Sequence, residues 1–169
     1  MKKGVIFSAA KSEVGGVLNS PKFGYRMVSE RPFEVWENPT KAVVITGIGL
    51  ANAATAFAWA AGEYDFDFAV NIGAAGASGK FGAADIGAYF DITGIACVEP
   101  YCEAVYELGT LGGARAATLA TSSRPASTAA QRARAAEFGE LVDMEGWALA
   151  QAAQAYSKKL YMRKILSDF

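Results

Sequence analysis

The run from Ala42 to Gly62 carries no charged residue, so it must be buried either in a membrane or in a protein core. Its first half is rich in β-branched residues and its second half in alanine. Gly47, Gly49 and Asn52 separate the halves, and such residues are typical of a turn. We therefore predict a core strand, a turn and a helix rather than a membrane span. We expect a cytoplasmic protein with no membrane partner.

The same order, an apolar strand followed by helix-forming residues, recurs along the chain and predicts an α/β fold with a mostly parallel or mixed central sheet. The 169 residues show no linker, internal repeat or low-complexity segment, so we expect one domain, 1–169. Strands are expected at 3–9, 25–30, 33–38 (these two as a hairpin), 41–49, 66–76, 85–100 (one or two strands), 113–121, 140–145 and 160–169, and helices at 50–64, 127–139 and 146–157.

Composition excludes several classes of function. The 16 basic and 17 acidic residues are spread along the chain, which gives no footprint for nucleic acid. Histidine is absent, which excludes an imidazole base or a histidine-ligated metal. Cys97 and Cys102 lack the paired spacing of a structural zinc site, so we expect free thiols in a reducing compartment, and no metal.

Two glycine-containing segments lie after predicted strands. "TGIGLANAA" (46–54) has a Gly-x-Gly pair, but Asn52 occupies the third glycine position of a dinucleotide fingerprint, and we favour a tight turn. "NIGAAGASG" (71–79) would allow close approach to the backbone at a strand end, where ligands of α/β proteins bind. On this segment alone, close packing and ligand contact are equally supported.

Three acids stand just past, or at the end of, predicted buried strands: Glu13, Glu145 and Asp168. The carboxyl ends of parallel strands meet at one edge of a sheet, so three distant carboxylates can share one cleft. For any single acid, a place in the first turn of a helix is the simpler explanation. Three acids in equivalent places favour a functional cleft.

The motifs "GVIFSAAKSEV", "VVITGIGLANAA", "VNIGAAG", "VDMEG" and "ILSD", taken in this order, resemble the nucleoside phosphorylase/nucleosidase superfamily. The nearest resemblance is to methylthioadenosine/S-adenosylhomocysteine nucleosidases and futalosine hydrolases. It implies a three-layer α/β/α fold with a central mixed sheet. It also implies hydrolysis of the bond between ribose and base in an adenosine-like purine nucleoside, without a cofactor. Carboxylates suffice for an acid, a water-activating base and an anion that stabilises the ribosyl cation.

The resemblance also implies roles for individual residues. Asp168 would protonate the purine N7, Glu13 would activate water, and Glu145 would accept hydrogen bonds from the ribose hydroxyls, with Met144 packing on the sugar. Asp143 receives no chemical role and is expected to cap the turn or to meet solvent. The loop near the substrate comprises Gly73, Ala74 and Gly76.

Alternatives within the superfamily remain open. Phosphorylases carry an arginine before the loop glycine, whereas Asn71-Ile72 precedes Gly73, so hydrolysis is favoured over phosphorolysis. Lys164 replaces the arginine before the "ISD"-type motif, and the segment 119–127, which corresponds to the base-stacking loop, contains no aromatic residue. A catalytically impaired nucleoside-binding homologue is therefore a second hypothesis. The helix expected at 50–64 is apolar almost all round, which predicts a homodimer.

Overall fold

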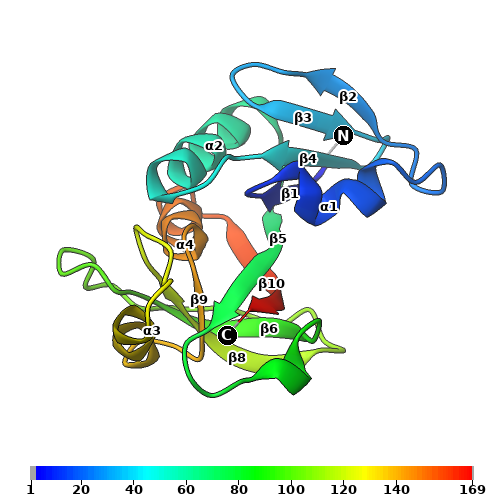
Figure 1. Cartoon of the computed structure of the whole chain (residues 1–169). Helices are drawn as coiled ribbons and strands as arrows, with labels where there is room; N and C mark the ends of the chain where they lie inside the picture. Colours follow the sequence, from blue (N-terminus) through cyan, green and yellow to red (C-terminus); the bar gives the residue numbers. More distant parts are fainter. Residues whose placement is uncertain (1–2, 169) are drawn as a thin grey trace.

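The computed structural model describes residues 3–168 and contains a ten-stranded mixed sheet surrounded by helices (Figure 1). The strand order is β10-β6-β8-β9-β5-β1-β4-β3-β2, with β7 beside β6 and a further pairing between β10 and β5. The elements are β1 (Gly4–Ser8), α1 (Lys11–Leu18), β2 (Arg26–Ser29), β3 (Glu34–Glu37), β4 (Lys41–Ile45), α2 (Leu50–Glu63), β5 (Phe68–Ala77), η1 (Ala83–Asp85), β6 (Tyr89–Cys97), β7 (Tyr106–Glu107), β8 (Arg115–Thr121), α3 (Ala129–Ala136), β9 (Leu141–Asp143), α4 (Gly146–Ala155) and β10 (Lys159–Asp168).

The side chains of β1 alternate between two apolar layers. Val5 and Phe7 belong to the main core with Phe57 of α2, and Phe7 stacks on Phe57 with ring centroids 5.0 Å apart. Ile6 points to the other face, where it packs with Val14 of α1. Successive side chains of a strand point to opposite faces, so the sheet has helices on both sides. Figure 1 shows β1 between α1 on one side and α2 with α4 on the other. The predicted α/β/α layering is confirmed.

Half of the sheet closes on itself. β10 lies between β5 and β6, parallel to the first and antiparallel to the second. β8 continues from β6, β9 from β8, and β9 then pairs with β5, which completes a ring of five strands. The other half stays open and ends in the β2–β3 hairpin. The ring brings the ends of β5, β9 and β10 together at one place.

The uncharged run proves to be β4, a turn and α2, as predicted. Gly47 and Gly49 have φ angles of 79° and 101°, values that side chains disfavour, so glycine allows the chain to reverse here. Within residues 3–168, no helix is long and apolar enough to span a membrane. The hairpin and the long helices also lie where the sequence predicts them. The predicted strand 160–169 is seen as β10, and its last residue lies outside the described range.

Candidate active site

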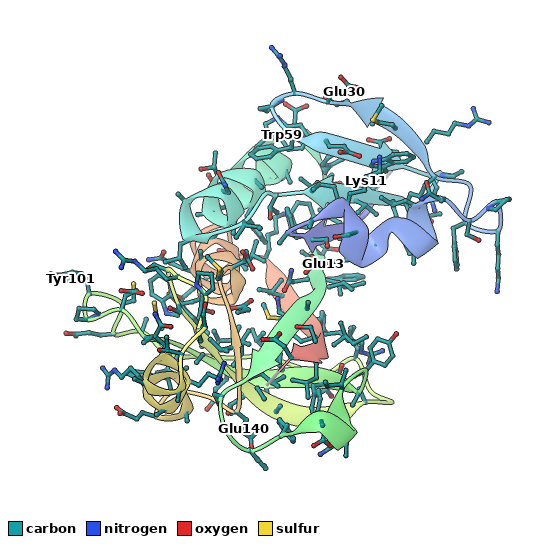
Figure 2. All side chains as sticks on the ribbon, viewed as in Figure 1. Lys11, Glu13, Glu30, Trp59, Tyr101 and Glu140 are labelled. Carbon is teal, nitrogen blue, oxygen red and sulfur yellow. The ribbon has the colours of Figure 1, made fainter. Side chains whose placement is uncertain are left out.

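Glu13 lies in the first turn of α1, where its carboxylate joins three segments. One oxygen, Oε2, accepts hydrogen bonds from the Ser8 hydroxyl at 2.7 Å and from the Ala10 amide at 3.1 Å. The other oxygen, Oε1, accepts from the Ala74 amide of β5 at 2.8 Å. Figure 2 labels Glu13 on α1 next to β5. The acid therefore caps the helix, as the simpler explanation requires, and at the same time faces the glycine/alanine segment of β5.

Gly73 explains how the Glu13 carboxylate reaches β5. A Cβ atom on Gly73 would lie 3.1 Å from Glu13 Oε1 and 3.2 Å from Oε2, closer than ordinary contacts allow. Gly76 has the same relation to Asp168, since a Cβ there would lie 3.1 Å from Oδ2. Close approach of a side chain to the backbone is the use of glycine that the sequence predicts for this segment. Two glycines of β5 thus make room for two of the predicted acids.

Glu145 lies between β9 and α4 and is only 6% exposed. Its Oε1 accepts a hydrogen bond from the Gly49 amide at 2.8 Å, at the start of α2, where the helix dipole favours a negative charge. Burial and, after it, the negative charge of Asp143 raise the pKa of Glu145, and the Gly49 hydrogen bond opposes this effect. One carboxylate oxygen is left for a further hydrogen-bond donor.

Asp143 has an ion-pair partner that the sequence did not reveal. Its Oδ2 lies 2.8 Å from Nζ of Lys164, and both side chains are almost fully buried. The Thr121 hydroxyl donates to Oδ1 at 2.7 Å, and the Gly146 amide donates to Oδ2 at 2.9 Å. Asp143 therefore caps the turn into α4, as expected. The alternative, contact with solvent, is wrong because Lys164 of β10 covers the carboxylate.

Asp168 ends β10, where a register irregularity places it opposite Gly76 of β5. Ser167 donates a hydrogen bond to Asp168 Oδ1 at 2.5 Å. The Asp168 side chain is exposed, unlike Glu145, so it is open to a ligand. In a regular strand, successive side chains point to opposite faces of the sheet. The irregularity between Leu166 and Asp168 interrupts this alternation.

One cavity of about 240 Å³ brings the predicted residues together. It lies where the start of α1 and the ends of β5, β9 and β10 meet. Gly73 is the exception, since it lies behind Glu13 and lines a neighbouring cavity instead. The predicted site residues that line the main cavity are Glu13, Ala74, Gly76, Met144, Glu145 and Asp168.

The cavity-lining residues that sequence reasoning missed include Ile48, Arg124 and Arg132. Ile48 belongs to the turn before α2 and is 61% exposed. Arg124 lies in the segment that the resemblance places beside the base, so its position could have been noticed. Arg132 lies on an amphipathic helix, α3, where an arginine is indistinguishable in sequence from one on a solvated face.

The comparisons with known proteins place this geometry in a known architecture. No family model and no curated protein matches the chain. Among solved structures, a futalosine hydrolase mutant of Helicobacter pylori superposes with a TM-score of 0.84 at 12% identity, over 99% of this chain and 90% of the other. The chain has the nucleosidase fold.

Two further solved structures have the same fold. The 5'-methylthioadenosine/S-adenosylhomocysteine nucleosidase of Neisseria meningitidis, in complex with methylthio-immucillin-A, gives a TM-score of 0.79 at 20% identity over 99% and 86% of the two chains. The nucleosidase of Colwellia psychrerythraea 34H, in complex with adenine, gives 0.81 at 20% identity over 99% and 83%. Nucleosidases thus share this architecture with the chain, although few of their residues are identical.

Proposed function

We propose that the chain is a purine nucleosidase, which hydrolyses the N-glycosidic bond of an adenosine-like nucleoside of the methylthioadenosine, S-adenosylhomocysteine or futalosine type. One observation carries this proposal: Glu13, Glu145 and Asp168, from three distant parts of the chain, line a single cavity of a nucleosidase fold. No cofactor is needed, because acid, base and anion are all carboxylates.

The proposed reaction needs three tasks from these side chains. Asp168 donates a proton to N7, so that the purine leaves as a neutral base. Glu13, whose Oε2 is held by Ser8 and Ala10, accepts a proton from the attacking water. Glu145 accepts hydrogen bonds from the ribose hydroxyls with the oxygen that Gly49 leaves free, and Met144 packs on the sugar. The negative charges also stabilise the oxocarbenium-like ribosyl group.

Water rather than phosphate is the proposed nucleophile. Asn71, which stands in the loop region where phosphorylases carry an arginine, is buried and donates through Nδ2 to the Phe7 carbonyl at 3.1 Å. It therefore offers no cation to a phosphate beside Glu13. A nucleoside-binding protein without catalysis is the second candidate, and the exposure of Asp168 is the observation that favours it, because an acid in water is harder to tune.

The test incubates the chain with adenosine, methylthioadenosine, S-adenosylhomocysteine or futalosine, each with and without phosphate. Release of free base is measured by chromatography. Glu13→Gln and Asp168→Asn are each expected to lower kcat at least about 100-fold, the usual contribution of a general acid or base. Glu137→Gln, just after the end of α3, is the matched control, because Glu137 pairs with Arg134 away from the cavity. Release that requires phosphate would indicate a phosphorylase, and binding without release would indicate the second candidate.

We also propose a homodimer in the cytoplasm. Small side chains form an outward stripe on α2, at Ala51, Thr55, Ala58 and Gly62, which continues to the exposed Ile48 beside the cavity. Such a stripe supports close helix packing between two copies. Sedimentation of the unaltered chain should give twice the monomer mass. The Ala58→Arg variant should give the mass of a monomer. Cys97 and Cys102 are both free thiols, which supports a reducing compartment.

A further inference from the structure

Cys97 and Cys102 lie on either side of a tight turn, and we refer to them as the thiol pair. Cys97 is the last residue of β6, and the turn after it is closed by a hydrogen bond from the Cys102 amide to the Glu99 carbonyl at 3.1 Å. Both side chains pack on the main apolar core, Cys97 within it and Cys102 at its edge. The turn therefore brings Cys102 back to the end of β6.

The two thiols contact each other. Burial, and after it a hydrogen bond between the two thiols and the charges of Cys102 and Glu99, raises the pKa of the Cys97 thiol to about 12, while a backbone hydrogen bond of Glu99 opposes this effect. Within residues 3–168, no third acid or cysteine joins the pair in a group that could hold a metal ion. The chemistry open to the thiol pair is thus that of a dithiol and its disulfide.

The loop that carries the thiol pair is fixed at both ends. The Ser123 amide donates to Glu99 Oε1 at 2.9 Å, and the indole Nε1 of Trp147 donates to the Ala104 carbonyl at 2.8 Å. Between these two anchors Tyr101 is 93% exposed, and Figure 2 shows it at the tip of a projecting loop. The anchors hold the thiols together, and the turn between them stays open to solvent.

The two thiols differ in their access to solvent. Cys97 is only 2% exposed, whereas Cys102 is half-buried. The thiolate is the reactive form of cysteine, and a buried thiol with a raised pKa seldom forms it. A reagent from solution should therefore modify Cys102 first, and Cys97 should then react with the modified Cys102 beside it. An accessible thiol next to a second, resolving thiol is a common arrangement in redox-active sites.

We propose that Cys97 and Cys102 form a reversible disulfide site, which a small disulfide such as oxidised glutathione oxidises in two exchange steps. First, the Cys102 thiolate attacks one sulfur of the reagent, a mixed disulfide forms, the S–S bond of the reagent breaks and one small thiolate leaves. Next, the Cys97 thiolate attacks the Cys102 sulfur, the internal disulfide forms and the second small thiolate leaves. Each leaving thiolate takes up a proton that a thiol of the chain has lost, so two thiols are oxidised and one reagent disulfide is reduced.

The free thiols of the structure are the reduced form of this site. Disulfides in a reducing compartment are usually transient, and they serve in catalysis or in sensing of the redox state. Neither Cys97 nor Cys102 lines the cavity of the proposed nucleosidase. The disulfide site therefore goes beyond the proposed function and stands or fails independently of it.

The experiment incubates the folded chain with reduced and oxidised glutathione at several ratios. Exchange is stopped with N-ethylmaleimide in urea, and the product is identified by mass spectrometry. The chain has only 2 cysteines, so the mass distinguishes the reduced chain, the mixed disulfide and the internal disulfide. The proteins are the unaltered chain, Cys97→Ala and Cys102→Ala, with circular dichroism to check folding. The unaltered chain unfolded in urea is the control for the effect of the fold.

We expect the unaltered chain to lose two hydrogen atoms and to take up neither glutathione nor maleimide. Dithiothreitol should restore both thiols. Cys97→Ala should stop with one glutathione on Cys102. Cys102→Ala should react at least about tenfold more slowly than Cys97→Ala, because its remaining thiol is buried. In urea, Cys97 and Cys102 should react at similar rates. If a variant does not fold, the mass of the unaltered chain still decides whether the disulfide forms.

Three results would overturn the proposal. The first is a folded chain that keeps glutathione on Cys102 while Cys97 stays free, because the thiol pair would then not close. The second is a disulfide between two chains, which electrophoresis without reductant detects. The third is a chain that stays reduced in the most oxidising buffer. Equal rates for the two folded variants would contradict the order of the two steps.

Discussion

Glu145 is a buried acid whose proposed role opposes its contribution to stability. Because burial raises its pKa in the folded chain, the folded state holds the Glu145 proton more tightly than the unfolded state does. Stability therefore falls as pH rises from the ordinary pKa of 4.5 through the raised value. Above that window the buried negative charge is a net cost to folding. The Gly49 amide only partly offsets this cost.

Glu145→Gln should thus stabilise the chain near neutral pH, by about 0.5–2 kcal/mol, the usual gain from relieving a functional site. Oε1 of glutamine still accepts the Gly49 hydrogen bond, so the turn is preserved. Urea unfolding at about pH 7 and about pH 4 measures the difference, which should vanish at the lower pH. Nucleoside affinity should fall in the same variant. A variant that is less stable than the parent at neutral pH would contradict this account.

The Lys164–Asp143 ion pair makes an equally specific prediction. Lys164→Met removes one partner of a fully buried pair and should cost about 3–5 kcal/mol in the free energy of unfolding, because Asp143 is left charged without a cation. Adding Asp143→Asn should recover part of the loss, since Oδ1 of asparagine still accepts one hydrogen bond from Thr121 or Gly146. Equal stability of the single and double variants would mean that the pair is not coupled.

At the scale of the element, β5 sets the positions of two proposed catalytic carboxylates through its glycines. Gly73→Ala should push the Glu13 carboxylate away from β5, because the new Cβ would lie about 3.1 Å from Oε1. We expect kcat to fall at least about tenfold, while the circular dichroism spectrum stays that of the parent. Gly94→Ala in β6 is the control, because a Cβ there meets Thr118 at an ordinary 3.6 Å. If Gly73→Ala were as active as Gly94→Ala, the position of the Glu13 carboxylate would not matter for catalysis.

The strands and helices also show how much of the fold and of the candidate site the sequence predicted. Glu13 and Asp168 could be brought together in advance because β1, β5 and β10 run parallel and their carboxyl ends lie at one edge of the sheet. Glu145 reaches the same place for a reason that the sequence did not show, since β9 runs antiparallel to β5. Gly15 and Gly16 weaken the intrinsic helix propensity of α1. In the structure it is held by tertiary contacts, with Val14 packed against the sheet.

Pairings across the sheet were beyond sequence reasoning. Lys164 and Asp143 lie on β10 and β9, which are not neighbours in the strand order, and no local pattern relates them. Arg132 was missed for a similar reason, since it faces the cavity only because α3 packs against β8 and β9. The alternation of strands and helices along the sequence predicts where strands end. Contacts between side chains of different strands depend instead on the strand order, which the sequence does not reveal.

At the scale of the whole molecule, the closed ring and the open hairpin should differ in local stability. The strands of the ring pair on both sides, whereas β2 forms the sheet edge and exposes Met27 and Val28. Amides of β5 and β10 should therefore exchange with solvent only by global opening, and those of β2 by cheaper local opening. Hydrogen exchange followed by mass spectrometry tests this. Uniform protection across both halves would contradict it.

The place of β10 in the ring has a consequence for how activity appears during folding. β5 and β6 follow one another in the chain, yet β10 lies between them, so the ring is complete only when β10 has inserted into this gap. Asp168 arrives at Gly76 in that same event. A partly folded chain that held Glu13 and Glu145 in place would still lack Asp168, the proposed proton donor. During refolding, activity would then appear only once β10 has inserted and the ring of strands is complete.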